Sequence, residues 1–248
     1  MILLKSETDL IKMRKAGLIL AGIMKKVIGS VRAGMSTRDI DNLTRELIRR
    51  ENAEPAFLGY NGYPASICVS INEEVVHGIP GERLIEESDI VSLDLGIKFQ
   101  GFFSDCTETV AVGKVAPRVR KLIDVTRQSL NEGIKAALPG NRLGDIAGAV
   151  QGYVEKNGFS VVRQFVGHGI GRSLHEEPEV PNFGRTGRGT VLEPGMVLAI
   201  EPMVNMGTWE CVVLDDGWTA VTADKKPSAH FEHTVAICKN GPEILTRL

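Results

Sequence analysis

The chain has 248 residues, of which 43% are hydrophobic and 24% charged, with a formal net charge of -2. These values are typical of a globular protein with one large domain or two small ones, and they give no reason to expect nucleic acid or an anionic membrane as partner. The four cysteines contain no CxxC pair, so we expect reduced thiols and a cytoplasmic protein. The charged N-terminal segment predicts no signal peptide, and we expect no membrane span.

Helical spacing of apolar residues predicts four helices, over residues 6 to 29, 36 to 51, 116 to 137 and 142 to 157. Ser6 with Asp9, and Ser36 with Asp39, have the spacing of capping boxes at two of the predicted helix starts. Strand-like runs occupy residues 66–72, 89–96, 102–112, 160–165, 196–204, 219–222 and 230–238. Strands interleaved with helices predict an α+β or α/β domain.

The chain contains a weak internal repeat. Residues 34–40 resemble residues 140–146 at an offset of 106, and residues 90–94 resemble residues 197–201 at an offset of 107. The alternative is chance similarity between amphipathic helices and strands. We interpret the chain as one catalytic domain, 1–248, made of two related halves, approximately 6–112 and 116–238, each bringing a carboxylate to a shared centre.

Acidic side chains stand where apolar strands are predicted. Asp94 and Glu201 lie in such segments, and neither segment contains Lys or Arg. An ionised carboxylate is costly to bury unless a positive charge meets it, and a shared cation is the simplest solution. Four carboxylates and one imidazole are suitable ligands for one or two divalent metal ions: Asp94, Asp105, His168, Glu201 and Glu232.

Asp94 and Asp105 flank a predicted hairpin. We predict that they face each other directly, with side chains ~5 Å apart. Like charges at that distance repel unless a proton or a cation lies between them. A surface hairpin with two solvated acids remains the alternative for this pair.

All five histidines lie in segments that could form a site: His77, His168, His175, His230 and His233. His168 stands among three glycines in residues 166–171, which indicates a backbone that approaches something closely, and a neutral imidazole suits a divalent metal. Neither His77 nor His175 lies in a strand-like segment. Each could be an unliganded acid/base or substrate-binding group, or a structural residue.

Glu232 and its neighbours do not form the HExxH motif of zinc proteases. Strand alternation places His230 and Glu232 on one face and His233 on the other, which predicts a structural role for His233. No GxSxG elbow, P-loop or dinucleotide-binding fingerprint occurs, and neither Cys68 nor Cys106 has the flanking residues of a cysteine protease.

The motifs at residues 74–80, 165–171, 199–203 and 230–234 together resemble those of type I methionine aminopeptidases, and the resemblance covers nearly the whole chain. It fits the short bacterial form, since we see neither an N-terminal zinc-binding extension nor room for the type II insertion between Glu201 and Glu232. The matching residues are His77, Asp94, Asp105, His168, His175, Glu201 and Glu232.

The resemblance implies the pita-bread fold, an α+β architecture with two pseudo-symmetric αβ halves around a central antiparallel sheet. It implies two adjacent divalent metal ions: Co, Mn or Fe, with Zn and Ni as further options. Asp94 would chelate one ion, His168 and Glu201 the other, and Asp105 and Glu232 would bridge both.

The implied activity is hydrolytic removal of the initiator methionine from nascent polypeptides, near the ribosome, by a monomer with no membrane or specific nucleic-acid partner. A metal-bound water would attack the carbonyl of the first residue, with Glu201 as general base. His175 would polarise that carbonyl, and His77 would contact the peptide nitrogen or the leaving group.

The resemblance also implies a methionine pocket. Aromatic edges and a thiol make favourable contacts with a thioether. Two rim positions depart from the family, because Phe57 replaces a small residue and Leu174 an aromatic one, so the depth of the pocket is open. The implied pocket residues are Tyr60, Tyr63, Cys68 and Trp218, with Phe57 and Leu174 at the rim.

Other readings from the same fold are less favoured. Prolidases and aminopeptidase P share the ligands but usually carry an extra N-terminal domain. Non-catalytic peptide-binding relatives and metal-free amidinohydrolases of the creatinase type have lost ligands, whereas this chain keeps all five.

Overall fold

The computed structural model describes residues 2 to 248. All four expected helices are present within two residues of their predicted ends, and both predicted capping boxes, Ser6 with Asp9 and Ser36 with Asp39, are formed. The helices are α1 (Glu7–Ile28), α2 (Thr37–Arg50), α3 (Pro117–Ala136) and α4 (Leu143–Lys156), with a short 3-10 turn, η1 (Tyr60–Gly62).

The strands form one nine-stranded sheet and two three-stranded sheets. The nine-stranded sheet contains β1 (Glu54–Pro55), β2 (Cys68–Ile71), β4 (Ile90–Phe99), β5 (Phe102–Ala111), β7 (Gly167–Gly169), β8 (Glu176–Val180), β9 (Val197–Ile200), β14 (Glu232–Cys238) and β15 (Gly241–Ile244). The small sheets contain β6 (Ser160–Val161), β10 (Met203–Asn205) and β13 (Ser228–His230), and β3 (Glu74–Val76), β11 (Cys211–Val213) and β12 (Ala220–Thr222).

Two predicted strands, 196–204 and 230–238, are each broken in the structure, and the prediction of continuous strands is wrong there. The chain leaves the large sheet at Pro202 and enters it at Phe231, so β9 pairs with β14 while β10 pairs with β13. Pro202 has no N–H to donate to a sheet ladder. Its carbonyl instead accepts the N–H of Phe231, 3.4 Å away, which joins the two breaks.

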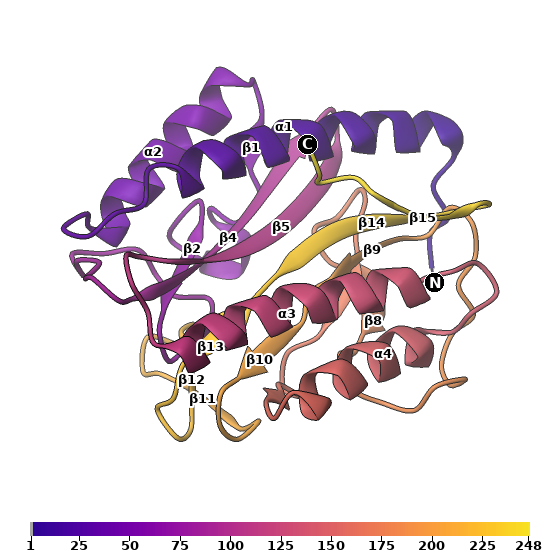
Figure 1. Cartoon of the computed structure of the whole chain (residues 1–248). Helices are drawn as coiled ribbons and strands as arrows, with labels where there is room; N and C mark the ends of the chain where they lie inside the picture. The colour runs from indigo at the N-terminus through magenta and orange to yellow at the C-terminus, as the bar shows by residue number, and fades with distance from the viewer. Residues whose placement is uncertain (1) are drawn as a thin grey trace.

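In Figure 1, helices α1 and α2 lie to one side of β14 and helices α3 and α4 to the other. Both pairs pack on the same face of the large sheet. Helix α1 packs on β4 and β5, while α3 and α4 pack on each other and on the strands of the second half. Strand alternation turns Cys106 toward the core beneath α1 and α2, and neighbouring Asp105 toward the opposite face. The predicted ligand Asp105 therefore lies on the face of the sheet away from the helices.

The two halves of the large sheet meet along a short seam. Strands β4 and β5 pair over ten residues, whereas the ladder between β5 and β14 has two residue pairs, Glu232 with Thr107 and His233 with Cys106. The hydroxyl of Thr234 adds hydrogen bonds to the backbone N–H and carbonyl of Asp105. The seam lies beside Asp105 and Glu232. The centre of the molecule is thus held by few backbone pairs at the place where the predicted ligands converge.

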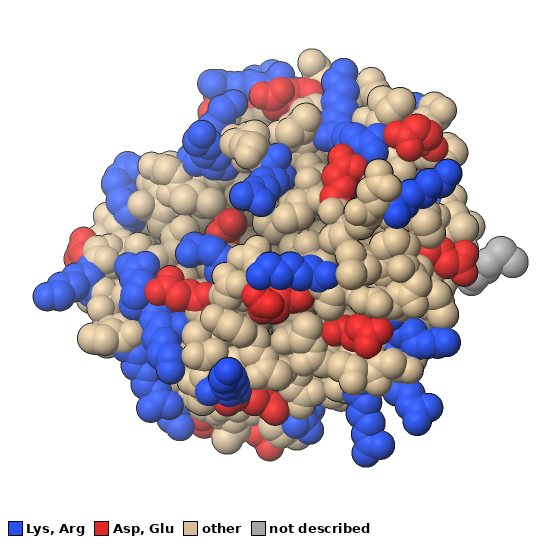
Figure 2. Space-filling model, turned by 45° about the vertical axis from the view of Figure 1, so that its right-hand side comes forward, with Lys and Arg blue, Asp and Glu red and all other residues tan. Residues whose placement is uncertain are grey.

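The surface carries both charge signs. On the face shown in Figure 2, Lys and Arg side chains alternate with Asp and Glu side chains rather than forming a field of one sign. Over residues 2 to 248, the chain has no helix with the length and apolarity needed to span a bilayer. All four cysteines are unpaired.

Candidate metal centre and active site

A cavity of about 280 Å³ opens on the face of the sheet away from the helices. It brings together every residue that the sequence and the resemblance indicated, and adds one, Asn61. The lining residues are Phe57, Tyr60, Asn61, Tyr63, Cys68, His77, Asp94, Asp105, His168, Leu174, His175, Glu201, Trp218 and Glu232.

The predicted register of the β4–β5 hairpin is wrong by two residues. Asp94 lies opposite Thr107, and Asp105 lies opposite Gly96, so the two carboxylates are diagonal neighbours on one face rather than directly opposed. A two-residue turn at Gln100 and Gly101, both with positive φ, sets this register. The two acids still share a face, because the shift keeps the alternation of both strands in phase.

Gly96 leaves room for the carboxylate of Asp105. A Cβ at this position would lie 2.8 Å from Cε1 of Phe57, 2.9 Å from Cβ of Ala56 and 3.3 Å from Oδ1 of Asp105. Only a residue without a side chain fits between the cavity wall and the acid.

The Gly96→Ala variant is therefore expected to lose ~1–3 kcal/mol of unfolding free energy, because the added methyl group overpacks the site. It is also expected to bind Mn(II) more weakly, since Asp105 must move. Urea unfolding and calorimetric metal titration measure the two effects. Gly152→Ala is the control, because nothing lies within 4 Å of the Cβ position there. A Gly96→Ala protein as stable as wild type would contradict the packing argument.

The carboxylates are buried without cationic side chains. Asp105 is 4% exposed and Glu232 is 2% exposed, and one oxygen of each has no hydrogen-bond partner. The hydroxyl of Thr107 lies 3.0 Å from Asp94 Oδ1 and 2.9 Å from Glu232 Oε2. Among residues 2 to 248, no Lys or Arg pairs with these acids. Such unpartnered buried oxygens fit a bound cation.

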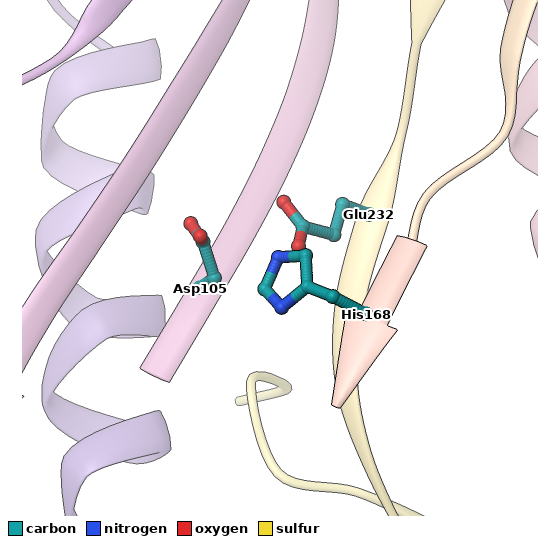
Figure 3. Close-up of side chains that lie close together, drawn as sticks. All are labelled: Asp105, His168 and Glu232. Atoms are coloured by element: carbon teal, nitrogen blue, oxygen red, sulfur yellow. The ribbon is translucent and has the colours of Figure 1, made fainter. Parts of the chain in front are cut away.

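His168 presents one nitrogen to the acids. Its Nδ1 lies 2.8 Å from the carbonyl oxygen of Gly169, which favours a proton on Nδ1 and leaves the lone pair of Nε2 free. Nε2 is 3.6 Å from Oε1 of Glu201. Ligand atoms of Asp105, His168 and Glu232 all lie within 4.8 Å of one another, and Figure 3 shows these side chains converging from β5, β7 and β14. This donor set of oxygens and one nitrogen fits a divalent metal ion.

Burial shifts the titration of these groups. It raises the pKa of Asp94 to about 6 and that of Glu201 to about 8, and it raises the pKa values of Asp105 and Glu232 well above their ordinary range. Burial also lowers the pKa of His168 to about 3. Without cations, burial therefore favours the protonated forms of Asp105, Glu201 and Glu232 and the neutral form of the imidazole near neutral pH, and cations would replace those protons.

The other two histidines line the cavity away from the acid cluster. Nδ1 of His175 lies 2.6 Å from the hydroxyl of Tyr60, and its ring centroid lies 4.2 Å from that of His168. His77 meets Phe165 and Trp218 edge-on, and burial lowers its pKa to about 4. Both imidazoles are thus held neutral near neutral pH, and each can accept or donate a hydrogen bond.

The apolar wall of the cavity includes both expected rim residues, Phe57 and Leu174. Phe57 and Leu174 are buried in the same cluster as Tyr63 and Cys68. Tyr63 contacts Trp218 edge-on at 5.0 Å between ring centroids. The wall is aromatic and sulfur-containing, and such groups make favourable contacts with a thioether.

Sequence reasoning missed several supporting residues. His230 is buried with Nε2 3.4 Å from Oε2 of Glu201, and Asn182 donates to the carbonyl of Glu201. Alternation had indicated that His230 shares a face with Glu232, but the break at Phe231 hid its distance from Glu201. No pattern pointed to Asn61 or Asn182. His233 lies outside the cavity with Nδ1 2.9 Å from the hydroxyl of Thr246, as alternation predicted.

The model of metallopeptidase family M24 matches residues 11–239 of the chain. A methionine aminopeptidase from Clostridium perfringens (strain 13 / Type A) is 54% identical over 246 residues, which cover 99% of each chain. The chain belongs to the methionine aminopeptidases of family M24.

Solved structures agree with this membership. The crystal structure of methionine aminopeptidase from Thermotoga maritima matches with a TM-score of 0.98 and 47% identity, covering 100% of both chains. The prolidase from Pyrococcus horikoshii OT3 matches with a TM-score of 0.81 at 24% identity, covering 98% of this chain and 63% of that chain, which shows a shared fold. The pita-bread fold expected for this family member is confirmed, and membership of a metallopeptidase family agrees with the buried acid and imidazole cluster.

Proposed function

We propose that this family member is a metal-dependent methionyl aminopeptidase (EC 3.4.11.18) that hydrolyses the bond after an N-terminal methionine. The observation that carries this proposal is the union of two features in one cavity. A cluster of acids with one imidazole lies beside a wall of Tyr63, Cys68 and Trp218. An N-terminal methionine whose thioether contacts that wall would present its backbone carbonyl to the cluster.

We propose two divalent ions at this centre: Co, Mn or Fe, with Zn and Ni as further options. The oxygen-rich donor set supports borderline-to-hard ions over those that prefer thiolates. Asp94 would hold one ion, His168 and Glu201 the other, and Asp105 and Glu232 would be shared. When bound, such ions supply Lewis acidity to water and to the scissile carbonyl.

The side chains divide the remaining work. Glu201, a carboxylate whose pKa burial raises, would take a proton from the attacking water and pass it on to the departing amine. His175, whose Nδ1 faces the Tyr60 hydroxyl, would use Nε2 to stabilise the negative charge that develops on the carbonyl oxygen. His77 would contact the peptide nitrogen or the leaving group.

We also propose that residues 1–248 act as a single catalytic domain built from duplicated halves. Two isolated backbone bridges support this proposal, since Ser36 pairs with Leu84 at the start of α2, and Arg142 pairs with Val191 at the start of α4. Each residue of the second bridge follows its counterpart in the first by the offset of the sequence repeat, 106 or 107 residues. The enzyme would act as a monomer, and its substrates would be nascent polypeptides near the ribosome.

The decisive test uses metal-stripped protein with a Met-Ala-Ser peptide, with and without Mn(II) or Co(II), and measures free methionine. Metal-restored release is expected. A Leu-Ala-Ser peptide tests the pocket, because Phe57 and Leu174 change its walls. No release with any metal from folded protein would overturn the proposed function.

A further inference from the structure

Among residues 2 to 248, one Lys or Arg ion pair is almost completely buried, and it joins the N-terminal segment to β8. Nζ of Lys5 lies 2.5 Å from Oε2 of Glu176, and the two side chains are 6% and 8% exposed. In every other Lys or Arg ion pair among residues 2 to 248, the cation is at least 31% exposed. Burying a lysine is costly without a partner, so this pair calls for an explanation.

The second oxygen of Glu176 holds the loop that carries His175. Its Oε1 accepts the backbone N–H of Arg172 at 2.6 Å and that of Ser173 at 3.1 Å. Within the loop, the N–H of Gly171 donates to the carbonyl of Ser173. One carboxylate therefore closes the turn on one side and binds Lys5 on the other. Leu174 and His175, which line the cavity, stand between these anchoring points.

Two glycines keep the lysine in place. A Cβ at Gly171 would lie 2.4 Å from Cε of Lys5, and a Cβ at Gly195 would lie 3.0 Å from the Lys5 carbonyl oxygen. The backbone N–H of Lys5 donates to the carbonyl of Gly195 at 2.7 Å, and its Nζ also donates to the carbonyl of Leu3. The lysine stem thus lies in a fitted channel and not along an open surface.

We propose that Lys5 is a positioning residue that fixes the 171–175 loop, and through it the imidazole of His175, by way of Glu176. The inference rests on the proposed function, in which His175 faces the scissile carbonyl. The ring of His175 has two restraints: the Tyr60 hydroxyl on its Nδ1, and its own backbone, which Glu176 anchors. Removal of the Lys5 ammonium leaves the buried Glu176 carboxylate without a positive partner. The carboxylate then turns toward water and no longer accepts the loop N–H groups, which releases the loop.

The test measures kcat, KM and Mn(II) affinity for the Lys5→Met variant of the metal-loaded enzyme. We expect kcat to fall about tenfold and KM to stay within about threefold, because a small misplacement of a group aimed at the transition state costs rate more than binding. Mn(II) affinity measured by calorimetry is expected to be unchanged. Lys15→Met, at an exposed position of α1, is the matched control and is expected to match wild type.

Two combinations separate positioning from general stability. Lys5→Met/Glu176→Gln strands no charge and keeps an acceptor for the two N–H groups, so it is expected to recover part of the lost kcat. Lys5→Met with Tyr60→Phe is expected to lose less than the product of the single losses, because both residues restrain one ring. If Lys5→Met fails to fold, the Lys5→Met/Glu176→Gln protein is compared with wild type by the same measurements.

Inactive wild-type enzyme under every metal would overturn the proposed function itself. Active wild type with a folded Lys5→Met variant of equal kcat would overturn only the positioning role. A double variant whose fold-loss in kcat equals the product of the Lys5→Met and Tyr60→Phe losses would also overturn the positioning role, because independent effects multiply.

Discussion

Replacement of Glu201 by alanine is expected to lower kcat for methionine release at least about 10³-fold, while the protein stays folded. Glu201 lies between two histidines, with Oε1 3.6 Å from Nε2 of His168 and Oε2 3.4 Å from Nε2 of His230. The variant removes both the proposed proton carrier and one ligand. Steady-state assays with the Met-Ala-Ser peptide, together with circular dichroism, check the result.

His175→Ala is expected to cause a loss of similar size without loss of metal, which separates the two roles. His233→Ala serves as the matched control, because His233 lies in the same strand as Glu232 but outside the cavity. Near-normal activity of either Glu201→Ala or His175→Ala would refute the assigned mechanism.

The chelated protein is expected to lose thermal stability as the pH rises from 6.5 to 8.5. The folded-state pKa of Glu201, about 8, lies above its ordinary value, so its proton stabilises the folded state at low pH and that stabilisation is lost as the pH rises through 8. Burial lowers the pKa values of His77 and His168 to about 4 and about 3, and their contribution is already complete above pH 6.5. We expect the Tm to fall on the order of 5 °C across this window.

Divalent cation is expected to reverse this loss. Saturating Mn(II) at about 1,000 times its Kd adds about 4 kcal/mol to the unfolding free energy, and the gain in Tm is expected to be larger at pH 8.5, where fewer protons compete. Scanning calorimetry under argon measures both effects. Glu201→Gln cannot titrate, so its chelated form is expected to lose part of the pH dependence, while Asp105 and Glu232, whose pKa values burial also raises, keep the rest. An unchanged slope in Glu201→Gln would assign the effect to another group.

The sequence was most informative where a rule of local chemistry applied. Capping boxes placed the starts of two helices, and acids in apolar strands indicated the residues that cluster in the cavity before any contact was known. The register of the β4–β5 hairpin was missed because the Gln100–Gly101 turn was not recognised as the two-residue connection that fixes it. The site roles themselves remain predictions that the experiments above test.

Other features depended on long-range packing. The breaks at Pro202 and Phe231 arise because the chain changes sheets there, and an apolar run of residues does not reveal which neighbour each strand will have. Asn182 supports Glu201 from a loop nineteen residues earlier in the chain. Nothing local marks such a residue, because its partner is defined only by the folded topology.

The short seam between β5 and β14 gives the proposed metal centre a second role, which is to hold the two halves of the sheet together. The backbone ladder between the two halves of the large sheet has two residue pairs there, directly beside Asp105 and Glu232. An ion bound by both side chains would cross-link the two strands at this short ladder. Loss of the ion would then remove the cross-link at the same moment that it stops the chemistry.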